Sequence, residues 1–275
     1  MKSIGLALGA SLTWGFADFF GPLKGRTLGA LRVLFYVQVG GLAAIALIVA
    51  VRGKGPADSA ALFAVPAAIS GTLGLYAYYR GMAVGAMSIV APIAGISAVV
   101  PVAFGIATGD RPSTWQWLGI LAALAGVFLA SREPGHGGKV AAGVGLALLA
   151  ALGFGGYFPP MHAAGQADFW WASLIFRMTS TAVILAAIAI RRPSLAVQPL
   201  QVPLLALIGI GDMLGNLLFA AASTSGLVSI TSVLASLYPI VTVILARVVL
   251  RERVARSQEA GIVLTLAGVA LISAG

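Results

Sequence analysis

Asp18 and Asp212 are the two carboxylates that stand inside long apolar segments of this 275-residue chain, and both are candidates for chemistry. A charged side chain in hydrocarbon is costly, so such a group usually faces a partner or a water-filled cavity. Asp212 lies near the middle of its segment, and Asn216 follows one helical turn later on the same face. Asp212 has two interpretations: it binds a proton or an amine, or it forms a structural ion pair with Arg177. Asp18 lies near the end of its segment, where lipid headgroups would also explain it.

Aromatic side chains with a polar tip form a second group of candidates. They combine an apolar ring with a hydrogen-bonding group, so they suit a site for flat or amphipathic organic solutes. The candidates inside the apolar segments are Trp14, Tyr76, Tyr79, Tyr157 and Tyr238. Tyr79 lies close to a segment end, so an interfacial position is also open for it. The interfacial aromatic belt is the interpretation for Trp115, Trp117, Trp170 and Trp171.

Ser229, Ser232 and Ser236 are spaced by three and four residues, which predicts one hydroxyl-lined helix face. Such a face binds a solute or donates hydrogen bonds to a neighbouring helix, and both interpretations stay open. A channel would predict continuous polar stripes along several helices, and this face is the nearest approach to one in the sequence.

The segments that carry these residues are too apolar for a water-soluble fold. Hydrophobic residues make up 60% of the chain, the mean hydropathy is +1.01, and 9% of residues are charged, against about 25% in a typical soluble protein. A soluble enzyme, a nucleic-acid-binding domain and a disordered chain are therefore excluded. The net charge of +9 is spread between the apolar runs rather than over one basic face. The absence of cysteine excludes disulfides and thiolate metal sites.

The apolar segments predict an all-α integral membrane protein with ten transmembrane helices, because a helix needs about 20 apolar residues to cross the hydrocarbon core. The loops between them are too short for an extramembrane domain, so the protein is expected to act inside the bilayer. The predicted spans are 3–22, 27–51, 61–81, 85–108, 114–131, 140–161, 168–190, 202–224, 227–249 and 257–274.

The two halves of the chain repeat each other. Residues 115–131 and 257–273 agree at nine of seventeen positions under a shift of 142. The pattern Gly85-x-x-Ser88-Ile89 recurs at Gly226-x-x-Ser229-Ile230, and Arg32 corresponds to Arg177, which favours a shared architectural role for the two arginines. The predicted repeats are 1–134 and 138–275. Each has five spans, an odd number, so the second must enter the membrane with the opposite orientation, as in inverted-repeat transporters.

Each half closes with an acidic-Arg pair followed by a glutamine and a glycine-bearing helix. The two copies read Asp110-Arg111…Gln116…Gly119…Gly126-Val127 and Glu252-Arg253…Gln258…Gly261…Gly268-Val269. With this motif in both halves, the chain resembles the drug/metabolite transporter superfamily and, within it, the EamA-type ten-helix exporters, including those of amino acids. The glycines are seven residues apart on one helix face, which predicts close helix packing rather than ligand binding. The resemblance implies a substrate path between the halves, where Trp14, Tyr76, Asp212, Asn216 and Tyr238 would converge.

The expected function is that of a secondary transporter that exports small organic metabolites by alternating access between the halves, with amino acids as the leading substrates. A multidrug or organic-cation exporter is the main alternative, and a passive channel is less favoured. No enzymatic activity and no cofactor are expected, because neither a His-Glu-x-x-His motif nor a phosphate-binding glycine loop is present.

The expected partners are a small-molecule substrate and the lipid bilayer, with protons as a candidate coupling ion and no nucleic acid. One chain holds both halves, so a monomer is sufficient and a dimer is compatible. The expected location is the inner membrane, in a multi-pass arrangement. Lysines and arginines crowd the loops after odd-numbered spans, which would place both termini outside by the positive-inside rule. The family resemblance implies instead that both termini lie in the cytoplasm.

Overall fold

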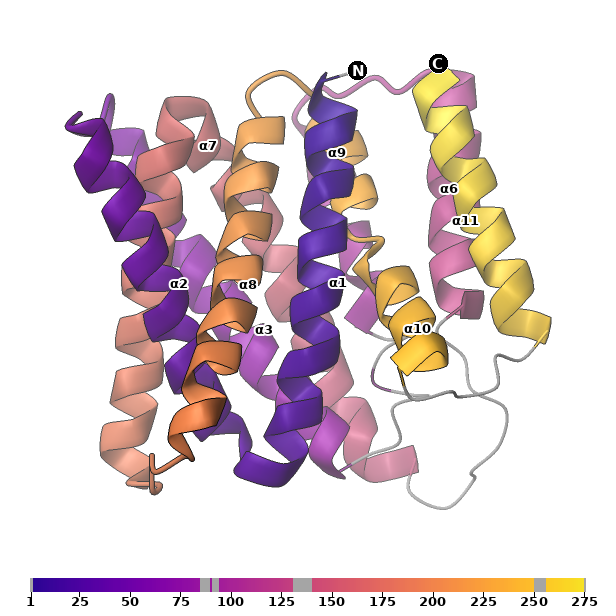
Figure 1. The fold of residues 1–275 in the computed structure, drawn as a ribbon. Coiled ribbons are helices and arrows are strands. Elements are labelled where there is room, and N and C mark those ends of the chain that lie inside the picture. The colour runs from indigo at the N-terminus through magenta and orange to yellow at the C-terminus, as the bar shows by residue number, and fades with distance from the viewer. Residues whose placement is uncertain (1, 85–89, 91–93, 131–139, 250–255, 275) are drawn as a thin grey trace.

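Helices are the only regular structure among the residues that the computed structural model describes, namely 2–84, 90, 94–130, 140–249 and 256–274 (Figure 1). This confirms the all-α prediction, which follows because a helix satisfies all its backbone hydrogen bonds internally in lipid. The boundary predicted between residues 134 and 138 lies outside the described residues. So do Gly85, Ser88 and Ile89 of the first copy of one repeated pattern, and Glu252-Arg253 of the second closing motif.

The first half supplies three long helices and a set of shorter ones. Their bounds are α1 Lys2–Leu28, α2 Ala30–Arg52, η1 Ser59–Phe63, α3 Ala64–Val84, η2 Ile96–Ala98, α5 Val99–Ala107 and α6 Thr114–Ala130. Gly29 joins α1 to α2 with a φ of 90°, a backbone conformation that glycine adopts without strain. Helix α1 ends at Leu28, which is six residues beyond the end predicted for the first span.

The second half begins with a long helical stretch that is kinked at Asp168, and it ends in shorter helices. The bounds are α7 Val140–Arg191, η3 Pro199–Gln201, α8 Val202–Ala222, α9 Val228–Ala235, α10 Tyr238–Val249 and α11 Arg256–Ala274. Helix α7 contains two of the predicted spans. They meet at a kink, where the backbone of Asp168 is extended (φ −162°, ψ 103°). The Asp168 carboxylate accepts hydrogen bonds from the backbone N–H groups of Trp170 (3.0 Å) and Trp171 (3.2 Å), so it caps the second of these helices.

Within the part of the chain that the structure describes, five helical segments are long and apolar enough to cross a membrane: Lys2–Leu28, Ala30–Arg52, Ser59–Val84, Gly145–Arg191 and Pro199–Ala222. The ninth predicted span, 227–249, was expected as one helix and is instead broken between α9 and α10. Proline has no N–H group and disfavours the α conformation in the residue before it, so Pro239 explains a break at this point. The first half is broken near the equivalent place: η2 interrupts the fourth span at Ile96–Ala98, which corresponds to 237–239 under the repeat shift of 141 and overlaps the break at 236–237.

The glycine-bearing helices of the two closing motifs pack against each other. Helices α6 and α11 lie side by side at one edge of the bundle (Figure 1). A Cβ atom at Gly126 would lie 2.7 Å from the Gly261 carbonyl oxygen, and one at Gly268 would lie 2.7 Å from that of Gly119. The repeated glycines therefore allow two backbones to approach, as predicted for packing residues.

Both chain termini lie at the same end of the bundle, whereas α7 begins at the other end (Figure 1). Helix α1 and the first part of α7 therefore run in opposite directions, as an inverted repeat requires. Between the halves, α3 packs along α7, and α8 packs against α1 and α2. These contacts bring the central parts of α1, α2, α3, α7 and α8 around a common interior.

Candidate functional site

A cavity lies in this interior, enclosed by helices of both halves. About 60 Å³ of it is open to the centres of water-sized molecules, which corresponds to a few waters. The first half lines it with Trp14, Asp18, Gln38, Gly71, Thr72 and Leu75. The second half lines it with Phe154, Tyr157, Phe158, Phe176, Ser180, Asp212, Asn216 and Tyr238.

Six of the eight residues singled out in the sequence line this cavity: Trp14, Asp18, Tyr157, Asp212, Asn216 and Tyr238. The other two lie elsewhere. Tyr79 is buried between α1 and α3, with its ring against Gly21 and Gly25. Tyr76 lines a second cavity at one end of the bundle. The convergence expected from the family resemblance is therefore present for Trp14, Asp212, Asn216 and Tyr238 but absent for Tyr76.

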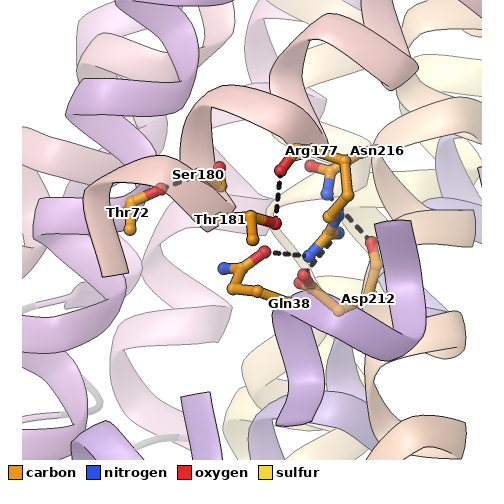
Figure 2. A network of polar contacts seen from close by, with 7 residues as sticks. All are labelled: Gln38, Thr72, Arg177, Ser180, Thr181, Asp212 and Asn216. Carbon is orange, nitrogen blue, oxygen red and sulfur yellow. Dashed lines mark hydrogen bonds and ion pairs between the residues drawn. The ribbon is translucent and has the colours of Figure 1, made fainter. Parts of the chain in front are cut away.

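Arg177 organises one wall of the cavity (Figure 2). Its side chain is 0% exposed, and its Nη2 donates to Asp212 Oδ2 at 2.7 Å while its Nη1 donates to Gln38 Oε1 at 2.6 Å. Gly41 of α2 makes room for it, since a Cβ atom there would lie 3.1 Å from Arg177 Nε. This ion pair agrees with the second interpretation of Asp212, a structural pair with Arg177. The Arg177 guanidinium of α7 thus bonds both Asp212 of α8 and Gln38 of α2.

Further hydrogen bonds extend this wall. The Thr72 hydroxyl of α3 donates to the Ser180 hydroxyl of α7 at 2.8 Å, and Asn216 Nδ2 donates to the backbone oxygen of Asp212 at 3.0 Å. Both are visible in Figure 2, where the Thr72–Ser180 pair stands apart from the group that Arg177 forms with Gln38, Thr181, Asp212 and Asn216. Three of these polar residues were not predicted from the sequence, because they are not ionisable: Gln38, Thr72 and Ser180. An amide inside an otherwise apolar span is the signal that would have found Gln38.

Asp18 lines the same cavity as Asp212 but has no partner of this kind in the described part of the chain. It is 8% exposed, and its carboxylate forms no hydrogen bond or ion pair with any residue that the structure describes. Because α1 continues to Leu28, Asp18 lies well inside the helix rather than near its end, and solvation by lipid headgroups does not explain it. Of the two acidic side chains that line the cavity, Asp212 is paired with Arg177 and Asp18 with no described residue.

An aromatic cluster forms a third part of the wall. The Trp14 ring meets Tyr157 edge-to-face, with centroids 5.7 Å apart, and Tyr157 meets Phe176 in the same manner at 5.3 Å. The buried hydroxyls of Tyr157 and Tyr238 have no hydrogen-bond partner among the described residues. Polar tips therefore remain available next to a rigid apolar surface. The sequence did not single out the phenylalanines of this wall, because a phenylalanine in an apolar segment does not differ from its neighbours. They are Phe154, Phe158 and Phe176.

The three serines of the ninth span differ in their hydrogen bonds. Ser229 bonds the loop of the other half: its N–H and hydroxyl both donate to Asp110 Oδ2, at 2.8 Å and 2.7 Å. Ser229 therefore bonds a neighbouring part of the protein, as one of the two interpretations held, although its partner lies in the loop between α5 and α6 and not in a helix. The hydroxyls of Ser232 and Ser236 are buried and have no partner among the described residues.

Arg32 and Arg177 do not share a role, although the repeat aligns them. Arg32 is half-buried at one end of the bundle, where its Nε donates to the backbone oxygen of Ser194 at 2.7 Å. Arg177 is fully buried and paired with a carboxylate. The expected common architectural role is therefore wrong, because the two halves place the aligned positions in different surroundings.

The comparisons with known proteins agree with this architecture. A family described as the EamA-like transporter family matches the chain twice, over residues 1–132 and 141–274. Comparison with curated protein sequences gives no match. Among solved structures, one titled only as the crystal structure of a protein superposes with a TM-score of 0.75 at 15% identity, covering 98% of this chain and 95% of that one. At that identity the likeness shows the fold alone.

Proposed function

Because the chain belongs to the EamA-like transporter family, and is therefore a multi-pass membrane transporter of small molecules, we propose that it exports small organic metabolites. Amino acids are the leading substrates, the inner membrane is the location, and the two halves give alternating access to the central cavity. The observation that carries the proposal is the cavity itself: it is lined from both halves, has an aromatic wall and holds an unpaired carboxylate.

In this proposal, the Asp18 carboxylate binds either the ammonium group of the substrate or a coupling proton. Asp212 was the first candidate for this role, but its charge is already balanced by Arg177 at 2.7 Å. A carboxylate without a partner favours a cation beside it, because an isolated charge is costly away from water. The aromatic surface of Trp14 and Tyr157 would receive the apolar part of the solute.

Alternating access fits the position of the cavity. Helices of both halves line it, so a movement of one half against the other would change the access to it. The breaks at residues 96–98 and 236–237 lie near equivalent points of the two repeats, and Tyr238 of the cavity wall follows the second directly. Helix breaks of this kind are typical of transporter binding sites and are suited to act as hinges.

An organic-cation exporter is the second candidate, and the unpaired Asp18 carboxyl group favours it. The two candidates differ in what the solute carries besides its cation. An amino acid adds a carboxylate, whereas a quaternary ammonium ion does not.

The experiment is flux into proteoliposomes that contain the purified chain, with protein-free vesicles as the control. A labelled panel of neutral, aromatic and cationic amino acids and one tetraalkylammonium ion is tested with and without an imposed proton gradient. Saturable flux of one amino acid class supports the proposal, and its response to the gradient separates coupled from facilitated movement. Saturable flux of the tetraalkylammonium ion alone moves the substrate class to organic cations. Flux that never saturates points to a channel and contradicts alternating access.

A further inference from the structure

A second cavity lies at one end of the bundle, away from the central one. It has about 290 Å³ open to the centres of water-sized molecules. The junction of α1 and α2 forms one side of it, and the end of α3 and the segment after α7 form the others. Tyr76, which the sequence analysis expected in the central cavity, lines this one instead.

Three guanidinium groups dominate this second cavity, and no carboxylate lines it. Arg32, Arg80 and Arg191 come from three different helices, and none of them forms an ion pair with a described residue. Arg32 is fixed by the hydrogen bond from its Nε to Ser194 O, so its two Nη groups remain for a ligand. Arg80 and Arg191 are exposed and donate to no described residue. Three like charges around one space repel each other unless an anion lies between them.

The start of α2 adds to the positive potential. Residues 28–32 line the cavity, and Gly29 at the N-cap offers no side chain to the first N–H groups of the helix. A helix N-terminus carries a partial positive charge and free donors, which favour an oxyanion. The guanidinium fork itself matches the geometry of a phosphate group.

We propose that the cavity of Arg32, Arg80 and Arg191, the arginine pocket, binds a phosphate group, and that its source is the headgroup of an anionic phospholipid. The pocket lies at helix ends, where headgroups stand when the bundle spans a bilayer, and Leu28 and Leu31 give it an apolar edge for the glycerol and acyl part of a lipid. Basic pockets between transmembrane helices are known to recognise such headgroups. The assignment is independent of which solute the central cavity carries.

The test measures lipid binding by the full chain in detergent, by native mass spectrometry, with phosphatidylglycerol and phosphatidylcholine as probes. The variant is Arg80→Gln with Arg191→Gln, which removes two charges and no hydrogen bond between described residues. The matched control is Lys24→Gln with Arg26→Gln, which removes two charges from the last turns of α1 outside the pocket. Size-exclusion profiles check that both variants fold, and Arg80→Lys provides a single variant that keeps the charge and loses the fork.

The expected result is that phosphatidylglycerol binds more tightly than phosphatidylcholine and that the pocket variant weakens it by about tenfold or more, as lost charge-assisted hydrogen bonds require. The control variant is expected to change this affinity by less than about twofold, because neither Lys24 nor Arg26 lines the pocket and charges that do not contact the ligand are screened at ordinary salt. A second arm measures the shift in thermal unfolding with inorganic phosphate against chloride at equal ionic strength. Protection by inorganic phosphate that depends on Arg80 and Arg191 supports the phosphate site and assigns it a soluble source as well. Equal losses in the two double variants, or no arginine-dependent binding of either probe, overturn the proposal.

Discussion

Asp18 and Asp212 face the same cavity from opposite halves of the chain, and their surroundings differ in one respect. Asp212 is bonded to a fully buried arginine that also binds Gln38, whereas Asp18 has no partner among the described residues. A buried pair that loses one member leaves an uncompensated charge, so Asp212 belongs to the structure of the wall. A buried charge without a partner weakens the fold, and its presence indicates a role in function.

The same contrast holds for the hydroxyl groups around the cavity. Thr72 and Ser180 satisfy each other across α3 and α7, while the hydroxyl of Tyr238 stays without a described partner. The paired groups should therefore matter for stability, and the unpaired groups for the solute. Each prediction below tests one side of this contrast.

The largest effect on stability is expected from Arg177→Met. The change leaves Asp212 charged and Gln38 without its donor, and the loss of one partner of a buried pair costs about 3–5 kcal/mol. Thermal unfolding of the purified protein in detergent measures it. The double variant Arg177→Met with Asp212→Leu removes both charges and should recover much of the loss, and a single variant as stable as the wild type would contradict the structural role of the pair.

A smaller loss is expected from Thr72→Val. Ser180 then keeps a buried hydroxyl without a partner, which costs about 1–3 kcal/mol. The same unfolding measurement detects it, with Thr72→Val plus Ser180→Ala as the control. If the double variant is as unstable as the single one, packing between α3 and α7 and not the hydrogen bond explains the effect.

The smallest change in stability is expected from Tyr238→Phe, because the lost hydroxyl has no described partner. Unfolding should shift by less than about 0.5 kcal/mol, while the KM for solute flux should rise several-fold. Tyr36→Phe is the matched variant, since the Tyr36 hydroxyl donates to Leu195 O at 3.0 Å outside the cavity. It should lose about 1 kcal/mol of stability and keep the KM; the reverse pattern would contradict the division between paired and unpaired groups.

The sequence allowed the fold and six of the fourteen residues that line the cavity to be predicted, for physical reasons that differ between residues. Hydropathy identifies spans, and a charge inside a span is costly enough to predict a buried site, so Asp18 and Asp212 were found. Tyr79 was misplaced because spacing along one helix gives a face but not the partner helix, which proved to be the glycine-bearing surface of α1. The difference between Arg32 and Arg177 was also beyond the sequence, since a repeat aligns positions without specifying what packs around each.

Gradient-driven flux and thermal unfolding of Asp18→Asn and Asp212→Asn, measured side by side, test the proposed division of roles most directly. Asp58→Asn serves as the control, because Asp58 caps η1 outside the cavity and asparagine caps a helix equally well. We expect Asp18→Asn to be at least as stable as the wild type, because it removes a buried carboxyl group without a described partner, and to lose the response of flux to the proton gradient. Asp212→Asn should lose stability, because Arg177 keeps a buried charge without its partner. An Asp18→Asn protein that still responds to the gradient, beside a stable Asp212→Asn protein that does not, would contradict the assignment and return the functional role to Asp212.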